Sequence, residues 1–519
     1  MANFIDLKDR RVVPNWRSFG TTTILGELNS FQIDRPYALL EPHIDEYIID
    51  WKLNKTTIHA ADLLSAAIVN NKKEDSAVTE AALFILNNPE KATFSQIDLA
   101  KSIINRKDEI DILSEFEQIN LNNIDGLIDR GPIVEKIRSL KYSLNQYAYN
   151  PIQLVELSRY YSILGQENKA IMAMRIALHL APDNRFVLRS ATRLFLHYQT
   201  EENNYIEFIH DILRNSAVTA YDPWLTSAEI SVATVRDRNS KFIKKGIELI
   251  NSKNIAPFNF TELASSIGTV ELLNGSTKKS RDFFNKSLIR PNDNSLAQIE
   301  WATTADNQLN INTQGVKVEM DFEATALDNY RKENFNEALV SALRWFADMP
   351  FSKRPILFAS NLASTVMKDQ PKAIAFLSEG LKSHPNDPIL INNLAYSLAL
   401  ENKTKEAFEA LDRLKGAHIN SDTTRICLTA TMGLAYFRQG FSDLGRKYYL
   451  DAIEETKHLN YRELNWVAIL NYAREELLAD TDEVEHIYAI IDKIPKNYSD
   501  IEIRTLRNDV EDLLEARRS

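Results

Sequence analysis

Side chains that can perform chemistry are few in this chain, and they do not gather into a catalytic pattern. Arg413 and His418 have a spacing at which both can engage a scissile phosphate if they share one helix face. Gly416 lies between them at an expected helix end, so we expect that they do not share that face. Gly126 and Gly131 lie in the stretch GLIDRGP, but no Lys-Ser or Lys-Thr pair follows them, so a phosphate-binding loop would lack its donor and its metal ligand.

Residues that bind metals or act as nucleophiles are equally isolated. The nine histidines are scattered without a second ligand at zinc-site spacing, and the patterns GxGxxG, GxSxG and HExxH are absent from the sequence. The single cysteine, Cys427, excludes an intramolecular disulfide framework and a thiolate zinc site. Because it lies in the apolar run TRICLTATMGLAYF, we expect a packed core thiol. The sequence therefore predicts no catalytic residue, no metal and no cofactor.

Charge and composition narrow the class of protein. The net charge of −11 does not favour nucleic acid as the main partner, because phosphate binding requires clustered positive charge. Acidic pairs such as Glu475 and Glu476 are expected on solvent-facing helix surfaces. No apolar run approaches the length of a membrane-spanning helix, and the N-terminal sequence lacks the apolar core of a signal peptide, so we expect a cytoplasmic location. Glycine is only 14 of 519 residues, which favours an all-helical chain.

One stretch, YNPIQLVELSRYYSILGQENKAIMAMRIALHLAPDN from Tyr149, has the spacing of two antiparallel helices joined by a tight turn. The first helix has one face formed by residues at i, i+3, i+4 and i+7, which are Leu154, Leu157, Ser158 and Tyr161. Gly165 ends that helix, and Pro182 ends the second one.

This stretch resembles a tetratricopeptide repeat, which is a helix pair of about 34 residues. Tyr161, Gly165, Ala170, Ala177 and Pro182 match the repeat pattern, whereas Leu154, Ser158 and Met174 replace its Trp, Gly and aromatic residue. Further good matches lie at 386–419 and near 426–457, and weaker ones fill most of 140–495. Such units bury their apolar faces only against neighbours, so one repeat implies others. The resemblance implies an all-α, right-handed α-solenoid.

Six segments are predicted along the chain. Residues 1–36 form an extended N-terminal arm that is too apolar for a disordered tail, and it either packs along its own chain or docks on another subunit. Residues 37–139 form a helical domain, or degenerate repeats, in which Thr93 and Gln96 have capping-box spacing. The remaining segments are repeats at 140–302, a loop at 303–320, repeats at 321–495 and a capping helix at 496–519.

Two surfaces are candidate binding sites. The resemblance implies a concave groove lined by the first helices, where partner-facing positions are Glu156, Arg159, Asn392, Asn393 and Tyr396. An amide at such a position can hold the backbone of an extended peptide by donating and accepting at once.

The second surface is basic: residues 230–291 contain eleven Lys or Arg and five acids. Because Lys241 and Lys278 lie at the starts of helices that should stack, their clusters should meet on one rim. The residues of this basic docking patch are Arg236, Arg238, Lys241, Lys244, Lys245, Lys278, Lys279 and Arg281.

These features predict a non-enzymatic scaffold or adaptor that holds a protein partner. Bacterial proteins of similar architecture often sense or restrain an effector, which is an argument from architecture alone. The alternatives are a nucleic-acid-associated adaptor that uses residues 236–290, and a helical ribonuclease that uses Arg413 and His418. A membrane partner is not expected, and the arm offers a route to a homo-oligomer.

Overall fold

Helix follows helix through the computed structural model, which describes residues 1, 9–28, 44–69, 72–73, 75–104, 115–122, 124–146, 149–199, 203–417, 419–480, 484–496, 498 and 500–518. No strand occurs among these residues. The predicted all-α fold is confirmed.

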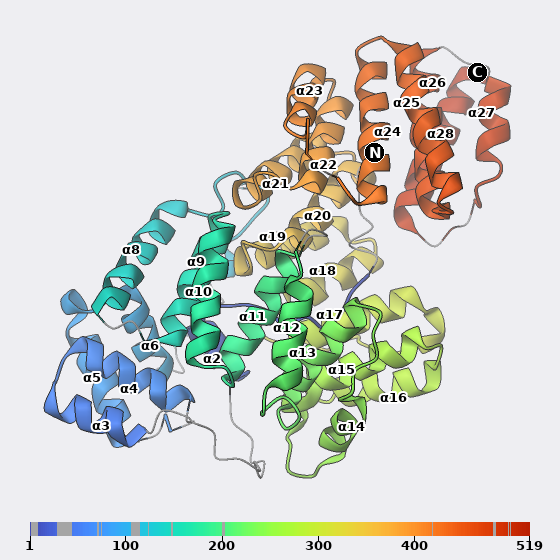
Figure 1. Ribbon diagram of the computed structural model, residues 1–519. Coiled ribbons are helices and arrows are strands. Elements are labelled where there is room, and N and C mark those ends of the chain that lie inside the picture. Colours follow the sequence, from blue (N-terminus) through green and yellow to red (C-terminus); the bar gives the residue numbers. More distant parts are fainter. Residues whose placement is uncertain are drawn as a thin grey trace.

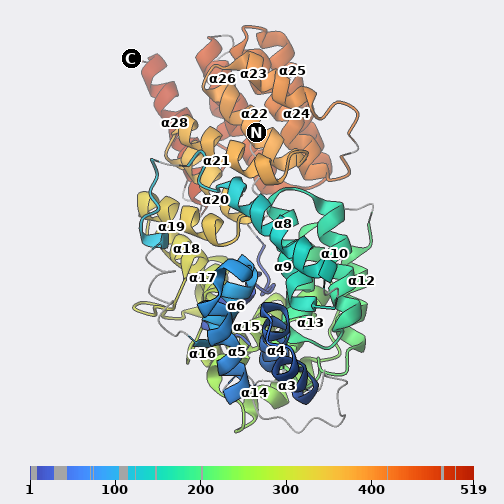
Figure 2. The ribbon, with the colours of Figure 1, turned by 90° about the vertical axis from the view of Figure 1, so that its left-hand side faces the viewer.

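Short helices pack side by side at one end of the molecule, where Figure 2 shows them in blue. They are α3 (Ile44–Leu53), α4 (Thr57–Val69), α5 (Ser76–Asn87), the 3₁₀ turn η1 (Pro89–Lys91) and α6 (Phe94–Ile104). α2 (Phe19–Ile24) precedes them in the chain and contacts α6, and the longer helix α8 (Arg130–Gln146) follows them. The predicted capping box is confirmed, since the amide of Thr93 donates to Gln96 Oε1 at 2.9 Å and the amide of Gln96 donates to Thr93 Oγ1 at 3.3 Å.

The array consists of paired helices that curve through the molecule from green to red in Figure 1. Its first half contains α9 (Pro151–Ile163), α10 (Glu167–Leu180), α11 (Arg185–His197), α12 (Tyr205–Asn215), α13 (Pro223–Val235), α14 (Ile243–Asn251), α15 (Pro257–Leu273), α16 (Thr277–Ser287), α17 (Asp293–Ala305) and η2 (Asn307–Leu309). Its second half contains α18 (Phe322–Arg331), α19 (Phe335–Asp348), α20 (Lys353–Asn361), the π-turn η3 (Leu362–Val366), α21 (Gln370–Ser383), α22 (Pro388–Leu400), α23 (Thr404–Asp412), α24 (Asp422–Arg438), α25 (Ser442–His458), α26 (Arg462–Ala479), α27 (Val484–Ile491) and α28 (Ile501–Arg518).

The pair α9–α10 shows why the sequence forms these units. Asn150 caps α9 by accepting a hydrogen bond from the amide of Gln153, and Pro151 fits the first helical position because no partner is needed for its missing N–H. Gly165 then adopts a left-handed conformation with φ of +67°, which only glycine adopts without strain. The next pair begins at Arg185, one repeat length after Pro151. The helix pairs are therefore tetratricopeptide-like, as predicted.

Small residues let the two helices of a pair cross closely. Ser158 Oγ of α9 donates to the carbonyl oxygen of Ala170 in α10 at 2.8 Å. In the pair α15–α16 the serine lies on the other helix, and Ser280 Oγ of α16 donates to the carbonyl oxygen of Gly268 in α15, also at 2.8 Å. The same crossing recurs because small residues occupy the same two positions of both pairs.

The first helices of successive pairs pack against one another and form the inner row of a solenoid. α11 contacts α9 and α13, and α15 contacts α13 and α17. This row curves so far that α9 and α11, at the start of the array, come close to α20 and α21. Ser383 Oγ at the end of α21 donates to the carbonyl oxygen of Ile163 at 2.7 Å, and Arg193 of α11 donates to Ser352 Oγ at 3.2 Å. Repeats that lie far apart in the sequence thus close the first superhelical turn into a ring.

Two details of the array differ from expectation or add to it. Glu475 and Glu476 are buried in α26 and pair with Arg438 at 2.7 Å and Arg446 at 2.6 Å, so their predicted solvent exposure is wrong. A helix enclosed by neighbouring helices has no solvent face, and its carboxylates then require arginine partners. The sequence does not predict α17 as a helix of its own, and the loop predicted at 303–320 overlaps the last turn of α17 and includes η2. The division into six segments remains a prediction.

Candidate functional site

The inner helices of the ring carry charged side chains that are almost completely buried. α11, α13 and α15 are covered on nearly all sides, yet they carry Arg189, Glu229 and Glu262 at 2%, 1% and 1% exposure. Charged side chains are almost never this buried unless they are paired. Glu229 pairs with His210 of α12 and with Ser240. The partners of Arg189 and Glu262 lie inside the ring, in the space that we call the lumen, which is enclosed by α9, α11, α13, α15, α17, α18 and α20.

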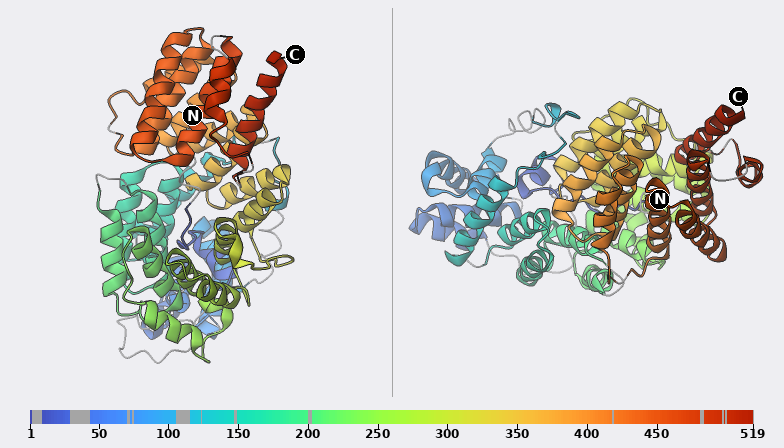
Figure 3. Two further views of the ribbon diagram at one scale, coloured as in Figure 1. Left: turned by 90° about the vertical axis from the view of Figure 1, so that its right-hand side faces the viewer. Right: turned by 90° about the horizontal axis from the view of Figure 1, so that it is seen from above.

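Residues 9–28, which belong to the predicted N-terminal arm, occupy this lumen. From here on, the arm means residues 9–28. Figure 3 (left) shows the arm in dark blue between the green and the yellow repeats. Residues 9–18 form no helix, and side chains of the inner helices bind their main chain. The carbonyl oxygens of Asp9, Arg10, Val12 and Val13 accept hydrogen bonds of 3.0 Å from Arg354, Gln298, Ser231 and Asn294, respectively. Bonds to carbonyl oxygens do not depend on the arm's side chains.

Arg10 lies in a socket of three side chains. Its Nε and Nη2 donate to the two carboxylate oxygens of Glu323 at 3.0 and 2.8 Å. Its Nη1 donates to Gln298 Oε1 at 2.8 Å, and Nη2 also donates to Asn294 Oδ1 at 3.0 Å. Burial alone would raise the pKa of Glu323, but the charge and hydrogen bonds of Arg10 outweigh it and hold the pKa below its usual range. We call these residues the Arg10 socket.

Arg17 lies in a second socket, which is lined by carboxylates. Its Nε donates to both oxygens of Asp348, at 3.0 and 2.8 Å, and Asp293 and Glu27 lie at 3.7 Å. Burial alone would lower the pKa of Arg17, but Asp348, Glu27 and Asp293 together raise it. Burial raises the pKa of Asp293 to about 8, since the charge of Arg17 opposes only part of the loss of hydration. These residues form the Arg17 socket.

Aromatic side chains on either side of Arg17 anchor the arm. Trp16 is 1% exposed, and its ring lies 5.0 Å from that of Phe351. Phe19 begins α2, packs edge-on against Phe186 at 5.0 Å, and donates its amide to Glu156 Oε1 at 2.8 Å. The arm is therefore part of the core of the ring.

The end of the arm joins a buried charge cluster. Glu27 pairs with Arg189 at 3.0 Å, and Arg189 pairs with Glu262 at 2.7 Å. Burial would raise the pKa of both carboxyls, but the charge of Arg189 and the hydrogen bonds from Arg189, Asn292 and Asn294 hold that of Glu262 below its usual range. Glu27 lacks those amide donors, and burial raises its pKa. The arm thus supplies one carboxylate to the lumen as well as two guanidinium groups.

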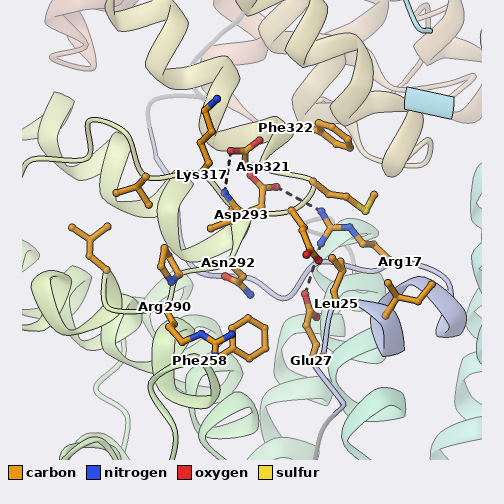
Figure 4. Close-up of a pocket in the computed structure, with 18 of the residues that line it drawn as sticks. Arg17, Leu25, Glu27, Phe258, Arg290, Asn292, Asp293, Lys317, Asp321 and Phe322 are labelled. Atoms are coloured by element: carbon orange, nitrogen blue, oxygen red, sulfur yellow. Dashed lines mark hydrogen bonds and ion pairs between the residues drawn. The ribbon is translucent and has the colours of Figure 1, made fainter. Parts of the chain in front are cut away.

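A cavity of about 1220 Å³ opens beside the Arg17 socket (Figure 4). Phe258 and Phe322 form apolar parts of its wall, and Lys317 lies at its exposed edge. Arg17 Nη2 and Asp293 Oδ2, which both line it, make no hydrogen bond within the described part of the chain. A smaller cavity of about 160 Å³ adjoins the Arg10 socket, but the guanidinium nitrogens of Arg10 all have acceptors.

The groove residues predicted on the second half of the array are buried around Met1, which lies near α22 and α24 (Figure 1). Asn392 Nδ2 donates to the carbonyl oxygen of Met1 at 2.8 Å and to Asn393 Oδ1 at 3.1 Å. The hydroxyl of Tyr396 donates to Asn471 Oδ1 at 2.9 Å. Asn392 therefore contacts main chain of the same protein, whereas Tyr396 contacts a side chain of α26.

The two groove residues predicted on the first half lie on α9 and face the arm. Glu156 accepts from the amide of Phe19, and Arg159 lies 3.8 Å from Glu156. They are far along the chain from Asn392 but belong to the same inner row. The groove prediction therefore identified positions on the inner row without identifying what contacts them.

The basic docking patch lies at the outer ends of α13, α14 and α16, and most of its cations have partners. Arg236 and Arg238 contact Glu207 at 2.5 and 3.5 Å. Lys241 donates to the carbonyl oxygen of Arg214 at 3.1 Å. The other paired members are Lys245 with Glu248 at 3.1 Å, Lys279 with Glu271 at 4.0 Å, and Arg281 with the carbonyl oxygens of Gln308 and Leu309 at 2.6 Å.

Lys244 and Lys278 of the patch are exposed. Lys286 at the end of α16 donates to Asn251 at the end of α14 at 2.9 Å, so the ends of these two helices meet. A common rim formed by their basic starts remains a prediction.

The remaining candidates for chemistry give no site. His418 lies outside the described residues, and Arg413 donates to the carbonyl oxygen of Pro385. Cys427 is buried as predicted, and burial raises its pKa to about 12. Among the described residues no group of His, Cys, Asp and Glu is arranged to hold a metal ion. The described helices also include none with the length and apolar character needed to span a membrane.

The sockets were not predicted, and their signal in the sequence is weak. Arg10 and Arg17 are two of several arginines in the arm, and the prediction that the arm is ordered rests on its apolar residues. Asn294 and Gln298 lie in α17, where polar residues on the inward face conceal the apolar period of a helix. A sequence signal does exist in α15, where Glu262 is the charged residue in the run FTELASSIG and the other residues of that run are apolar or small.

Comparisons with known proteins find distant structural likeness. No protein-family model and no curated protein matches the chain. Among solved structures, the APC/C hetero-tetramer Cut9–Hcn1 has a chain that is 11% identical, with a TM-score of 0.45 and coverage of 92% of each chain. Yeast Tom70 is 11% identical with a TM-score of 0.32, covering 92% of this chain and 97% of that one. The human IFIT1 dimer with m7Gppp-AAAA is 12% identical with a TM-score of 0.29, covering 98% and 99%. At these scores the assignment as a helical-repeat solenoid depends on the helix pairs themselves.

Proposed function

We propose that this protein is a non-enzymatic scaffold that captures an extended protein segment in its lumen, and that the arm is the resident occupant. The observation that carries this proposal is the set of four hydrogen bonds from inner-helix side chains to main-chain carbonyl oxygens at 9, 10, 12 and 13. A surface that binds carbonyl oxygens can accept main chain from another protein in the same way.

Because the arm is buried in the lumen, it is part of the folded structure. Charged residues of the lumen such as Asp348 lose their partner when the arm leaves, and an unpaired buried carboxylate is costly. A partner segment that replaces the arm restores those pairs. Capture of a partner is therefore coupled to release of the arm, which gives the scaffold a means to sense or restrain an effector.

Exchange of the arm tests this function. A protease site introduced between Leu28 and Ile44 allows the arm to be cut from an otherwise intact, folded chain. A fluorescent peptide of residues 9–28 is then added, and its incorporation is followed by anisotropy while mass spectrometry follows loss of the cut arm. We expect saturable incorporation of the peptide and none of a scrambled one. If the native peptide fails to enter a cut protein whose helical signal is unchanged, the lumen is closed to external segments and the proposal is wrong.

A further inference from the structure

We propose that the lumen selects segments carrying two arginines separated by six residues, and that Arg10 and Arg17 of the arm mark this specificity. This inference rests on the proposed function and adds the chemical class of the partner to it. The partner is an extended, non-helical segment with an aromatic residue directly before the second arginine, as Trp16 precedes Arg17.

The Arg10 socket fits a guanidinium group and no other cation. Glu323 accepts two parallel hydrogen bonds, and Gln298 and Asn294 accept one each, so all three nitrogens of the Arg10 guanidinium donate. The planar guanidinium group has donors in a fixed fork that match these acceptors. A lysine ammonium is a compact charge with three donors on one nitrogen atom, so it does not match them. A lysine at this position would leave buried acceptors without a donor, which is costly.

The Arg17 socket requires positive charge but is less demanding of shape. Within the described part of the chain, Nε makes the hydrogen bonds of Arg17, both to Asp348, while Asp293 and Glu27 lie 3.7 Å from the guanidinium. Lysine should therefore be tolerated better at the second position than at the first.

The fixed distance between the sockets sets the spacing. The carbonyl oxygens of Arg10, Val12 and Val13 are held between them, and Pro14 favours an extended backbone before it and cannot donate to a helix. Trp16 fills the apolar space beside Phe351 just before Arg17 enters its socket. A shorter or longer interval would place one arginine outside its acceptors, because the helices that carry them are packed in one ring.

Arg11 provides a matched control within the arm. Its hydrogen bonds go to Asp9 and to the carbonyl oxygen of Arg10, which are residues of the arm itself. It has the same side chain and lies one residue from the first socket. Arg11→Lys therefore measures the general effect of an arginine-to-lysine change without removing a hydrogen bond to the inner helices.

The test is competition of unlabelled peptides against the labelled peptide of residues 9–28 on the cut protein. We expect Arg11→Lys to compete within about twofold of the native peptide, since it loses no bond to the lumen. Arg10→Lys should bind at least about tenfold more weakly, because bonds to a buried carboxylate are lost. Arg17→Lys should fall between these two, and Arg10→Ala with Arg17→Ala should not compete.

The outcomes separate this inference from the proposed function. If no peptide enters the lumen, the proposed function and this inference both fail. If all peptides compete equally, the lumen still captures extended segments, but its selection of arginine is wrong. A Glu323→Gln protein supplies a second measurement, in which the penalty for Arg10→Lys should shrink several-fold; an unchanged penalty would place the selection elsewhere. The peptide series uses the unaltered lumen, so it decides the question even if that variant does not fold.

Discussion

Among the carboxylates around Arg17, Glu27 also pairs with Arg189, whereas Asp348 forms its ion pair with Arg17. Asp348 is 8% exposed as a residue and bonds both of its oxygens to Arg17 Nε. Removing one partner of a buried ion pair costs about 3–5 kcal/mol, whereas replacing both partners by apolar residues is often nearly neutral. We therefore predict that Asp348→Ala lowers the free energy of unfolding by about 3 kcal/mol or more.

A double variant shows whether the loss of stability comes from an unpaired buried charge or from lost packing in the Arg17 socket. Arg17→Met with Asp348→Leu should recover most of the loss in urea unfolding experiments. Arg138→Ala is the control, because the Arg138–Glu135 pair is 70% and 59% exposed and contributes little. A double variant as unstable as Asp348→Ala would mean that the shape of the socket, and not an unpaired charge, sets its stability.

Asp293 should make stability fall as pH rises. Burial raises its pKa to about 8 in the folded chain, while an unfolded aspartate titrates near about 3.9. Between these values the folded state holds one more proton than the unfolded state. The free energy of unfolding therefore decreases with pH through this window, by at most about 1.4 kcal/mol per pH unit from this group.

Asp293→Asn should remove that component, because an amide does not titrate but its oxygen can still accept from the amide of Ala324. The measurement is urea unfolding of both proteins at pH 5 and pH 8, where the variant should gain stability relative to the parent as pH rises. Asp412→Asn, which changes an exposed carboxylate, is the control. Parallel pH profiles for Asp293→Asn and the parent would show that Asp293 is ionised throughout.

At the scale of elements, two turn glycines give a matched test of ring closure. Gly165 and Gly275 follow the first helix of their pairs and have φ of +67° and +76°. A Cβ on Gly275 would meet nothing within 4 Å, whereas one on Gly165 would lie 2.8 Å from the carbonyl oxygen of Ser383. Gly275→Ala should cost about 1–2 kcal/mol from backbone strain alone.

Gly165→Ala should cost at least about 1 kcal/mol more, because the end of α21 must move and its Ser383–Ile163 hydrogen bond is disturbed. Thermal and urea unfolding of the two variants measure the difference. Equal costs would show that the contact between the α9–α10 turn and α21 yields without penalty.

The helix pairs could be predicted from sequence because their signals are local. The spacing of Leu154, Leu157 and Tyr161 predicts α9, and Gly165 and Pro182 follow the observed ends of α9 and α10. α17 escaped because its inward face carries Asn294 and Gln298, which the arm contacts and which break the apolar stripe. The position of the arm could not be predicted, since Arg10 meets Glu323 at a distant point of the sequence and no local pattern joins them.

At the scale of the molecule, ring closure determines how the arm can leave the lumen. Arg130 of α8 pairs with Glu379 of α21 at 2.7 Å and is 22% exposed, so it joins the two ends of the first turn near the surface. Arg130→Ala should loosen this closure while Lys382 still neutralises Glu379 at 2.6 Å. A partly exposed pair contributes at most about 1 kcal/mol, which corresponds to a several-fold faster opening.

We therefore predict that a cut arm dissociates several-fold faster from Arg130→Ala than from the parent protein, with the same final affinity for the arginine-bearing peptide. The measurement is the release rate of a labelled arm after dilution into excess unlabelled peptide. Arg138→Ala on the same helix should leave the rate unchanged, because Arg138 pairs with Glu135 of its own helix. An unchanged rate for Arg130→Ala would mean that the arm slides out lengthwise through a closed ring, and partners would then have to enter by a free end.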